Sequence, residues 1–215
     1  MIAKAHLRGE VRLSHTEAKA IRTEKCYIKR MAQTPSTMIP LGTPFPHFTL
    51  PEPLSGVPIS TRDLDRSKGT LVMVICNHCP YVIHVLPQIK AITEEYSKKG
   101  LAIVAFSSND AVKYPADGPA QIAEFAKEHA LVFPYLYDES QDVARSFDAA
   151  CTPEFYLFDS NDLLVYRGQL DGSTPKNDVP LTGDALRGAL KAHFAGEPID
   201  EDQRPSVGCN IKWKE

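Results

Sequence analysis

The residues best suited to chemistry are two cysteines three positions apart, in the run Cys76-Asn77-His78-Cys79-Pro80. A pair at this spacing can close a small disulfide, and the thiolate is its reactive form. Apolar residues before the run predict a buried strand, and three- and four-residue apolar steps after it predict a helix. Because a helix N-terminus offers unpaired N–H groups that favour a thiolate, we predict that Cys76 and Cys79 are catalytic.

His78 lies between the two cysteines and is the first candidate for tuning them. A protonated imidazole would stabilise the neighbouring thiolate, and stabilising the reduced form makes the disulfide a stronger oxidant. Haem attachment is excluded, because it requires His directly after the second Cys, where this chain has Pro80. A zinc site stays an alternative, but it would need two further ligands, for which Cys151, Cys209 and His84 are available.

The chain has five cysteines, an odd number that does not suit a disulfide framework built for stability. Cys151 directly precedes Thr152-Pro153, and Cys209 lies in a segment with Pro and Gly near the C-terminus. Both are candidate additional redox thiols. A small buried core residue is an equally good interpretation of Cys151, and a free thiol in a packed tail is one of Cys209. Cys26 is predicted to have no redox role.

The composition of the chain limits the classes of partner that it can be expected to bind. The 215 residues are 43% hydrophobic and carry a net charge of -3, which suits one well-cored domain and gives no general attraction to nucleic acid or to an anionic membrane. Residues 1–30 hold eight Lys or Arg against three Glu and lack a signal-peptide pattern. We therefore predict a basic flexible extension at 1–30, a domain at 38–200, a tail at 201–215, and a cytoplasmic location.

The elements that must position the cysteines alternate along the chain. Strands are predicted at 70–75, 101–107 and 132–137, and helices at 80–96, 120–130 and 141–149, with an extended strand in the proline-rich stretch 40–53. An antiparallel hairpin at 155–166 and a helix at 183–194 follow. This order predicts an α/β fold with a parallel sheet core, an antiparallel hairpin at its edge and covering helices.

Four motifs carry a family resemblance: CNHCPYV at 76–82, FPYLYDE at 133–139, CTPEFYLFD at 151–159 and SVGCNIKWK at 206–214. In this order they resemble the peroxiredoxin-like group of thioredoxin-fold proteins, related to alkyl hydroperoxide reductase and thiol-specific antioxidant proteins. The resemblance implies a thioredoxin-like fold, with a central mixed sheet, a C-terminal antiparallel hairpin and helices on both faces. It also implies that Thr152 and Pro153, joined by a cis peptide bond, shape a substrate groove facing the CxxC pair.

The resemblance leaves open which cysteine attacks. In thioredoxins the first cysteine is the nucleophile, which would be Cys76. In peroxiredoxins the peroxide-attacking position falls on Cys79, but there Cys76 replaces a Thr, Val72 replaces a Pro, and the site's Arg is replaced near Cys151. Since those groups stabilise the leaving oxygen, their loss favours disulfide exchange over efficient peroxide reduction.

The implied activity is therefore antioxidant-type thiol oxidoreduction with no bound cofactor. Expected partners are a protein or low-molecular-weight thiol reductant and a disulfide or peroxide substrate. Two hypotheses from other functional classes remain open: a zinc-stabilised binding module, and a thioredoxin-fold adaptor that binds polypeptide without turnover.

Overall fold

The computed structural model describes residues 33–215, so the predicted basic extension and Cys26 lie outside the described residues. The centre of the fold is a five-stranded sheet in the order β6-β5-β4-β8-β9. Its strands are β4 (Thr70–Val74), β5 (Ala102–Ser107), β6 (Tyr135–Tyr137), β8 (Glu154–Phe158) and β9 (Leu164–Gly168). β4, β5 and β6 are parallel, whereas β8 and β9 run antiparallel, so the mixed sheet and its hairpin are confirmed.

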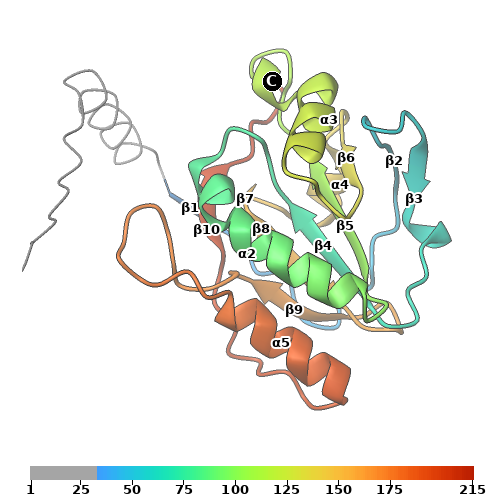
Figure 1. Cartoon of the computed structure of the whole chain (residues 1–215), viewed down its shortest axis with the longest axis vertical. Helices are drawn as coiled ribbons and strands as arrows, with labels where there is room; N and C mark the ends of the chain where they lie inside the picture. Colours follow the sequence, from blue (N-terminus) through green and yellow to red (C-terminus); the bar gives the residue numbers. More distant parts are fainter. Residues whose placement is uncertain (1–32) are drawn as a thin grey trace, which may run out of the picture. The chain divides into compact units, whose positions relative to one another are not determined.

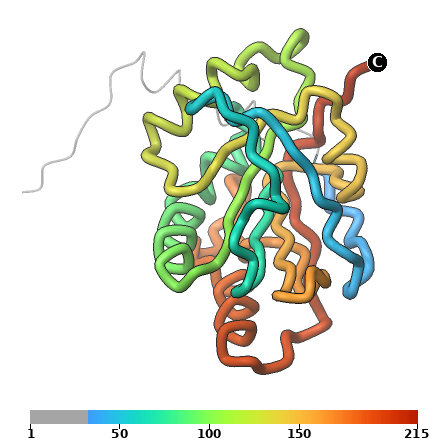
Figure 2. Tube along the Cα trace, turned by 90° about the vertical axis from the view of Figure 1, so that its right-hand side faces the viewer, coloured from blue at the N-terminus to red at the C-terminus, as the bar shows by residue number. Residues whose placement is uncertain are grey.

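Helices cover both faces of this sheet, as predicted (Figure 1). They are α2 (Pro80–Ser97), α3 (Pro119–Glu128), α4 (Asp142–Ser146) and α5 (Asp184–Ala195), with short 3₁₀ turns η1 (Thr61–Asp63) and η2 (Pro115–Asp117). Figure 2 shows the central strands between α2 on one side and, on the other, α4 with the chain that follows residue 33. None of the helices described here is long and apolar enough to cross a membrane.

The alternation of side chains along β4 explains these two layers. Val72 and Val74 point into an aromatic-rich core with Phe106, Phe147 and Phe158. Leu71 and Met73, on the opposite face, are also fully buried. Both faces of this strand are packed against other elements, so side chains pointing to either face must be apolar. This explains why the strand is a continuous apolar run in the sequence.

Three predicted elements are shorter in the structure, for physical reasons. Within 40–53 only β2 (Thr49–Pro51) forms, paired with β3 (Pro58–Ser60), because proline cannot donate to a strand ladder. The predicted helix 141–149 is reduced to α4, since left-handed Gln141 and Asp148 flank it. The predicted strand 132–137 begins only after Pro134.

A second, small sheet brings the C-terminal segment to the functional end of the fold. The segment predicted as a tail supplies β10 (Val207–Asn210), which lies between β1 (Thr34–Pro35) and β7 (Cys151–Thr152). Both pairings are antiparallel, and Cys209 faces Thr152 across the ladder. Gly208 is required at this crossing, because a Cβ there would lie 1.9 Å from the Thr152 carbonyl oxygen.

Candidate active site

The two cysteines of the CxxC run lie at the junction between β4 and α2, as predicted. Cys79 is the N-cap residue of α2 and Pro80 occupies its first turn, where a missing N–H costs nothing. Cys76 and Cys79 are 1% and 0% exposed, and both are free thiols. Two buried thiols therefore lie at the N-terminal end of an 18-residue helix.

Thr152 and Pro153 face this pair from the start of the neighbouring strand, and the peptide bond that joins them is cis. The Cys76 Sγ lies 3.3 Å from the Thr152 hydroxyl oxygen. The Cys79 Sγ lies 3.2 Å from the Thr152 carbonyl oxygen, to which its protonated form donates. Thr152 thus contacts both sulfurs.

Cys209 is the third thiol of the cluster. Its Sγ lies 3.0 Å from the Sγ of Cys79, and it is 2% exposed. The pairing of β10 with β7 places it there, since Cys209 is the residue opposite Thr152. Of the two extra candidate redox thiols, Cys209 is the one in contact with the CxxC pair.

Cys151 has a different partner. Its thiol donates to the carboxylate of Glu154 at 3.3 Å, and Glu154 also accepts from the main-chain N–H of Cys151 and of Ala150. Burial first, and then the nearby Glu154, raise the pKa of Cys151 well above its ordinary value. A thiol held protonated by a buried carboxylate is a poor nucleophile, so this environment suits the core role weighed for Cys151.

Cys79 is the thiol of the cluster whose pKa is lowered. Burial would raise its pKa, but hydrogen bonds from Cys209 and Cys76 oppose this, together with Thr152 and the main-chain N–H of Val82. The balance lowers the pKa of Cys79 well below its ordinary 9.0. The two thiols that donate to it change in the opposite direction: their hydrogen bonds to Cys79, with burial, raise the pKa of Cys76 and of Cys209.

His78 is held by a buried carboxylate that the sequence did not reveal. Its Nδ1 lies 2.6 Å from Oδ2 of Asp117, which is fully buried. This contact raises the pKa of His78 above 6.5, although partial burial acts in the opposite direction. The ring also stacks parallel to Tyr114, with centroids 6.0 Å apart.

Asp117 also fixes the backbone of the CxxC loop. Its Oδ1 accepts from the main-chain N–H of Asn77 at 2.8 Å, and its Oδ2 accepts from the Asn109 amide at 2.7 Å. The Tyr135 hydroxyl donates to Oδ1 of Asn77 at 3.0 Å. Asn109, which follows β5, therefore supports the loop through Asp117.

Among residues 33–215, one group of side chains could hold a metal ion. Donor atoms of Cys76, His78 and Asp117 lie within 4.8 Å of one another. This set differs from the zinc ligands considered in the sequence, because His84 instead bonds the Ser173 hydroxyl at 2.7 Å. Three donors of Cys, His and carboxylate type fit zinc chemistry with one position left open.

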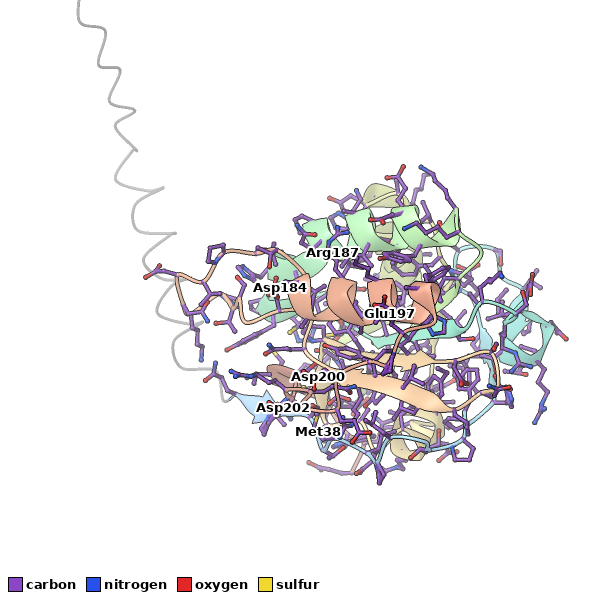
Figure 3. The ribbon with its side chains drawn as sticks, turned by 90° about the horizontal axis from the view of Figure 1, so that it is seen from below. Met38, Asp184, Arg187, Glu197, Asp200 and Asp202 are labelled. Atoms are coloured by element: carbon purple, nitrogen blue, oxygen red, sulfur yellow. The ribbon has the colours of Figure 1, made fainter. Side chains whose placement is uncertain are left out.

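A hollow of about 560 Å³ lies between α5 and the segment that follows it. Its lining includes Asp184, Asp200 and Asp202, which face the viewer in Figure 3. No cysteine lines it. This hollow is therefore separate from the thiol cluster.

Comparison with known proteins places the chain among redox proteins. Residues 40–186 match the Redoxin family. An uncharacterised conserved protein from Geobacillus kaustophilus is 47% identical, with a TM-score of 0.84 over 86% of this chain and 97% of its own. A hypothetical protein from Sinorhizobium meliloti 1021 is 39% identical, with a TM-score of 0.82 over 84% and 98%.

A more distant structure shares the fold. A thiol:disulfide interchange protein of the thioredoxin family from Chlorobium tepidum TLS is 15% identical, with a TM-score of 0.55 over 71% of this chain and 97% of its own. Among curated proteins, none matches this chain. The thioredoxin-like fold implied by the four motifs is confirmed.

Proposed function

Because the chain belongs to the Redoxin family, we propose that it is a thiol–disulfide oxidoreductase that works through the Cys76 and Cys79 pair. The observation that carries the proposal is the placement of Cys79, with a lowered pKa, at the N-cap of α2 and in hydrogen-bond contact with a second thiol of raised pKa. A thiolate beside a protonated thiol is the state from which disulfide exchange begins.

The charge distribution supports Cys79 as the attacking thiolate, rather than Cys76 as the thioredoxin comparison implied. The Cys79 thiolate attacks one sulfur of a substrate disulfide, the substrate S–S bond breaks, and one substrate thiolate leaves and takes a proton. Cys76 then gives up its proton and attacks the Cys79 sulfur. The second substrate thiolate leaves with that proton, so that the substrate gains two electrons and the protein becomes the Cys76–Cys79 disulfide.

A thiol reductant must then return two electrons to the disulfide. It can be a protein or a low-molecular-weight thiol, and a reducing cytoplasm would supply either. His78 is the positioning and tuning residue of this proposal. Its imidazolium, fixed by Asp117, stabilises negative charge on the neighbouring pair.

The test is to trap the covalent intermediate. Reduced wild type, Cys76→Ser and Cys79→Ser are each mixed with glutathione disulfide, alkylated and mapped by mass spectrometry. We expect an internal Cys76–Cys79 disulfide in wild type and, at the earliest times, glutathione on Cys79 in Cys76→Ser. Rapid glutathionylation of Cys76 in Cys79→Ser would reverse the assigned roles, and no reaction at either cysteine in any variant would contradict the proposal.

Burial of the pair favours a second candidate function, peroxide reduction. Both cysteine residues are at most 1% exposed, so a peroxide reaches the Cys79 thiolate with less displacement of the surrounding side chains than a bulky disulfide needs. The thiolate would then become a sulfenic acid, and Cys76 would displace water to form the disulfide. Stopped-flow oxidation of the reduced protein by hydrogen peroxide, compared with glutathione disulfide, separates the two. Faster oxidation by peroxide would favour the peroxidase.

A further inference from the structure

We propose that Cys209 is a second resolving thiol, which forms a Cys79–Cys209 disulfide as an alternative to the Cys76–Cys79 disulfide. This inference rests on the proposed function, because it takes Cys79 as the attacking thiolate. It adds a redox role for β10, a strand more than a hundred residues away from the CxxC run in the sequence.

Geometry is the first support. The Cys209 and Cys79 sulfurs are 3.0 Å apart, which is about 1 Å longer than a disulfide bond. β10 lies beside α2, and it is held there by pairing with both β1 and β7 (Figure 1). A disulfide from Cys79 to Cys209 therefore requires no strand to move to a new partner.

Thr152 is the second support. Its carbonyl oxygen lies 3.2 Å from the Cys79 Sγ, and Cys209 is the residue opposite it in the ladder between β10 and β7. The same residue therefore fixes the positions of both sulfurs.

The chemical step is a thiol exchange that balances without an added oxidant. After Cys79 has formed a mixed disulfide with the substrate, Cys209 loses its proton and its sulfur attacks the Cys79 sulfur. The bond between Cys79 and the substrate sulfur breaks, and the substrate leaves as a thiolate that takes up the proton. The product is the Cys79–Cys209 disulfide, with Cys76 still reduced.

Cys151 provides the contrast within the same sheet. It lies on β7, next to the strand that carries Cys209, but its thiol donates to Glu154. We therefore expect Cys79 to pair with Cys209 and not with Cys151.

The experiment follows the fate of the mixed disulfide in the full chain when Cys76 is absent. Reduced Cys76→Ser is mixed with glutathione disulfide, quenched by alkylation at set times and mapped. We expect glutathione on Cys79 to be replaced by a Cys79–Cys209 disulfide. In Cys76→Ser/Cys209→Ser the mixed disulfide should persist at least about tenfold longer, because an oriented intramolecular thiol has a high effective concentration. Cys76→Ser/Cys151→Ser is the matched control and should behave as Cys76→Ser does.

The outcomes separate this inference from the proposed function. If Cys79 is glutathionylated in Cys76→Ser but no Cys79–Cys209 disulfide follows, the role of Cys209 is wrong while exchange at Cys79 stands. If Cys79 does not react in wild type or in any variant, both fail. Circular dichroism of each variant verifies folding, and wild type in glutathione buffers of graded potential gives a second readout that needs no substitution. There we expect both disulfides, and finding only Cys76–Cys79 at every potential would overturn the inference.

Discussion

At the scale of single residues, the charge on His78 depends on one buried carboxylate. Asp117 raises the pKa of His78 above 6.5, so folding favours the protonated ring. The resulting stabilisation is fully present below pH 6.5 and is lost as the pH rises through the raised value. Its size should be below about 1 kcal/mol, because the ring is partly exposed.

We therefore expect His78→Gln to lower the free energy of unfolding at mildly acidic pH and to have little effect at alkaline pH. Urea unfolding of both proteins across this range measures the difference. NMR titration of the imidazole in Asp117→Asn provides a check, since losing the carboxylate should lower the pKa of His78. A pKa unchanged by that substitution would contradict the assigned cause.

The Cys79 thiolate depends on its sulfur donors. Cys209→Ala removes one hydrogen bond to it, and a bond to a charged group contributes roughly 1.5–3 kcal/mol, so we expect the pKa of Cys79 to rise by about one to two units. Thiolate absorbance in the ultraviolet, followed against pH, measures this change. Cys151→Ala is the control, because Cys151 donates to Glu154, and it should leave the pKa of Cys79 at or below its wild-type value.

Sequence reasoning finds residues whose type and spacing are distinctive, and misses those that act through burial. Cys76, Cys79 and His78 are close together in the chain, and the Thr152-Pro153 motif predicted that these two residues face the cysteine pair. Asp117 and Glu154 are single carboxylates among 27 acidic residues, and nothing nearby in the sequence indicates that each is almost wholly buried. The same holds for Cys209, whose neighbour Cys79 lies 130 positions away.

At the scale of elements, apolar patterning predicted the strands and helices that build the central sheet. It failed where backbone chemistry overrides patterning. Prolines limit pairing in the stretch 40–53, and left-handed residues shorten the helix after Gln141. The pairing of β10 with β7 could not be predicted either, because the sequence of a four-residue strand contains little information about which strand it pairs with.

That pairing can be tested through Gly208. A Cβ at this position would lie 1.9 Å from the Thr152 carbonyl oxygen, so Gly208→Ala must push β10 away from β7. We expect a loss of about 1–3 kcal/mol in the free energy of unfolding and slower formation of the Cys79–Cys209 disulfide. Gly188→Ala is the matched control, because nothing lies within 4 Å of its Cβ on α5, and it should add about 0.5–1 kcal/mol. Equal behaviour of the two variants would mean that β10 is not held closely against β7.

At the scale of the whole molecule, folding changes the protonation of separate groups in opposite directions. His78 and buried Glu154 both have raised pKa values, from the Asp117 contact and from burial respectively, so the folded chain holds protons that the unfolded chain releases. Cys79 does the reverse, because its pKa is lowered on folding. Stability therefore falls with pH through the first two groups and rises with pH through Cys79.

Oxidation removes the charge on Cys79, so the redox state of the protein can be measured through the pH dependence of its stability. Between the lowered pKa of Cys79 and its unfolded value of 9.0, the unfolded reduced chain binds one more proton at this site than the folded chain. That difference contributes about +1.4 kcal/mol per pH unit to the free energy of unfolding. Cys76 and Cys209 contribute nothing there, since raised pKa values keep them protonated in both states.

We therefore expect the free energy of unfolding of the reduced protein, plotted against pH from 6 to 8, to have a slope more positive by up to about 1.4 kcal/mol per unit than that of the oxidised protein. The Cys79 charge also raises the pKa of His78, and this reduces the difference. Urea unfolding with and without a non-thiol reductant gives both slopes. Cys79→Ser in the reduced state supplies the control and should reproduce the oxidised slope. Parallel curves for the reduced and oxidised proteins would mean that Cys79 is an ordinary thiol in the folded chain. The attacking role proposed for it would then have no electrostatic basis.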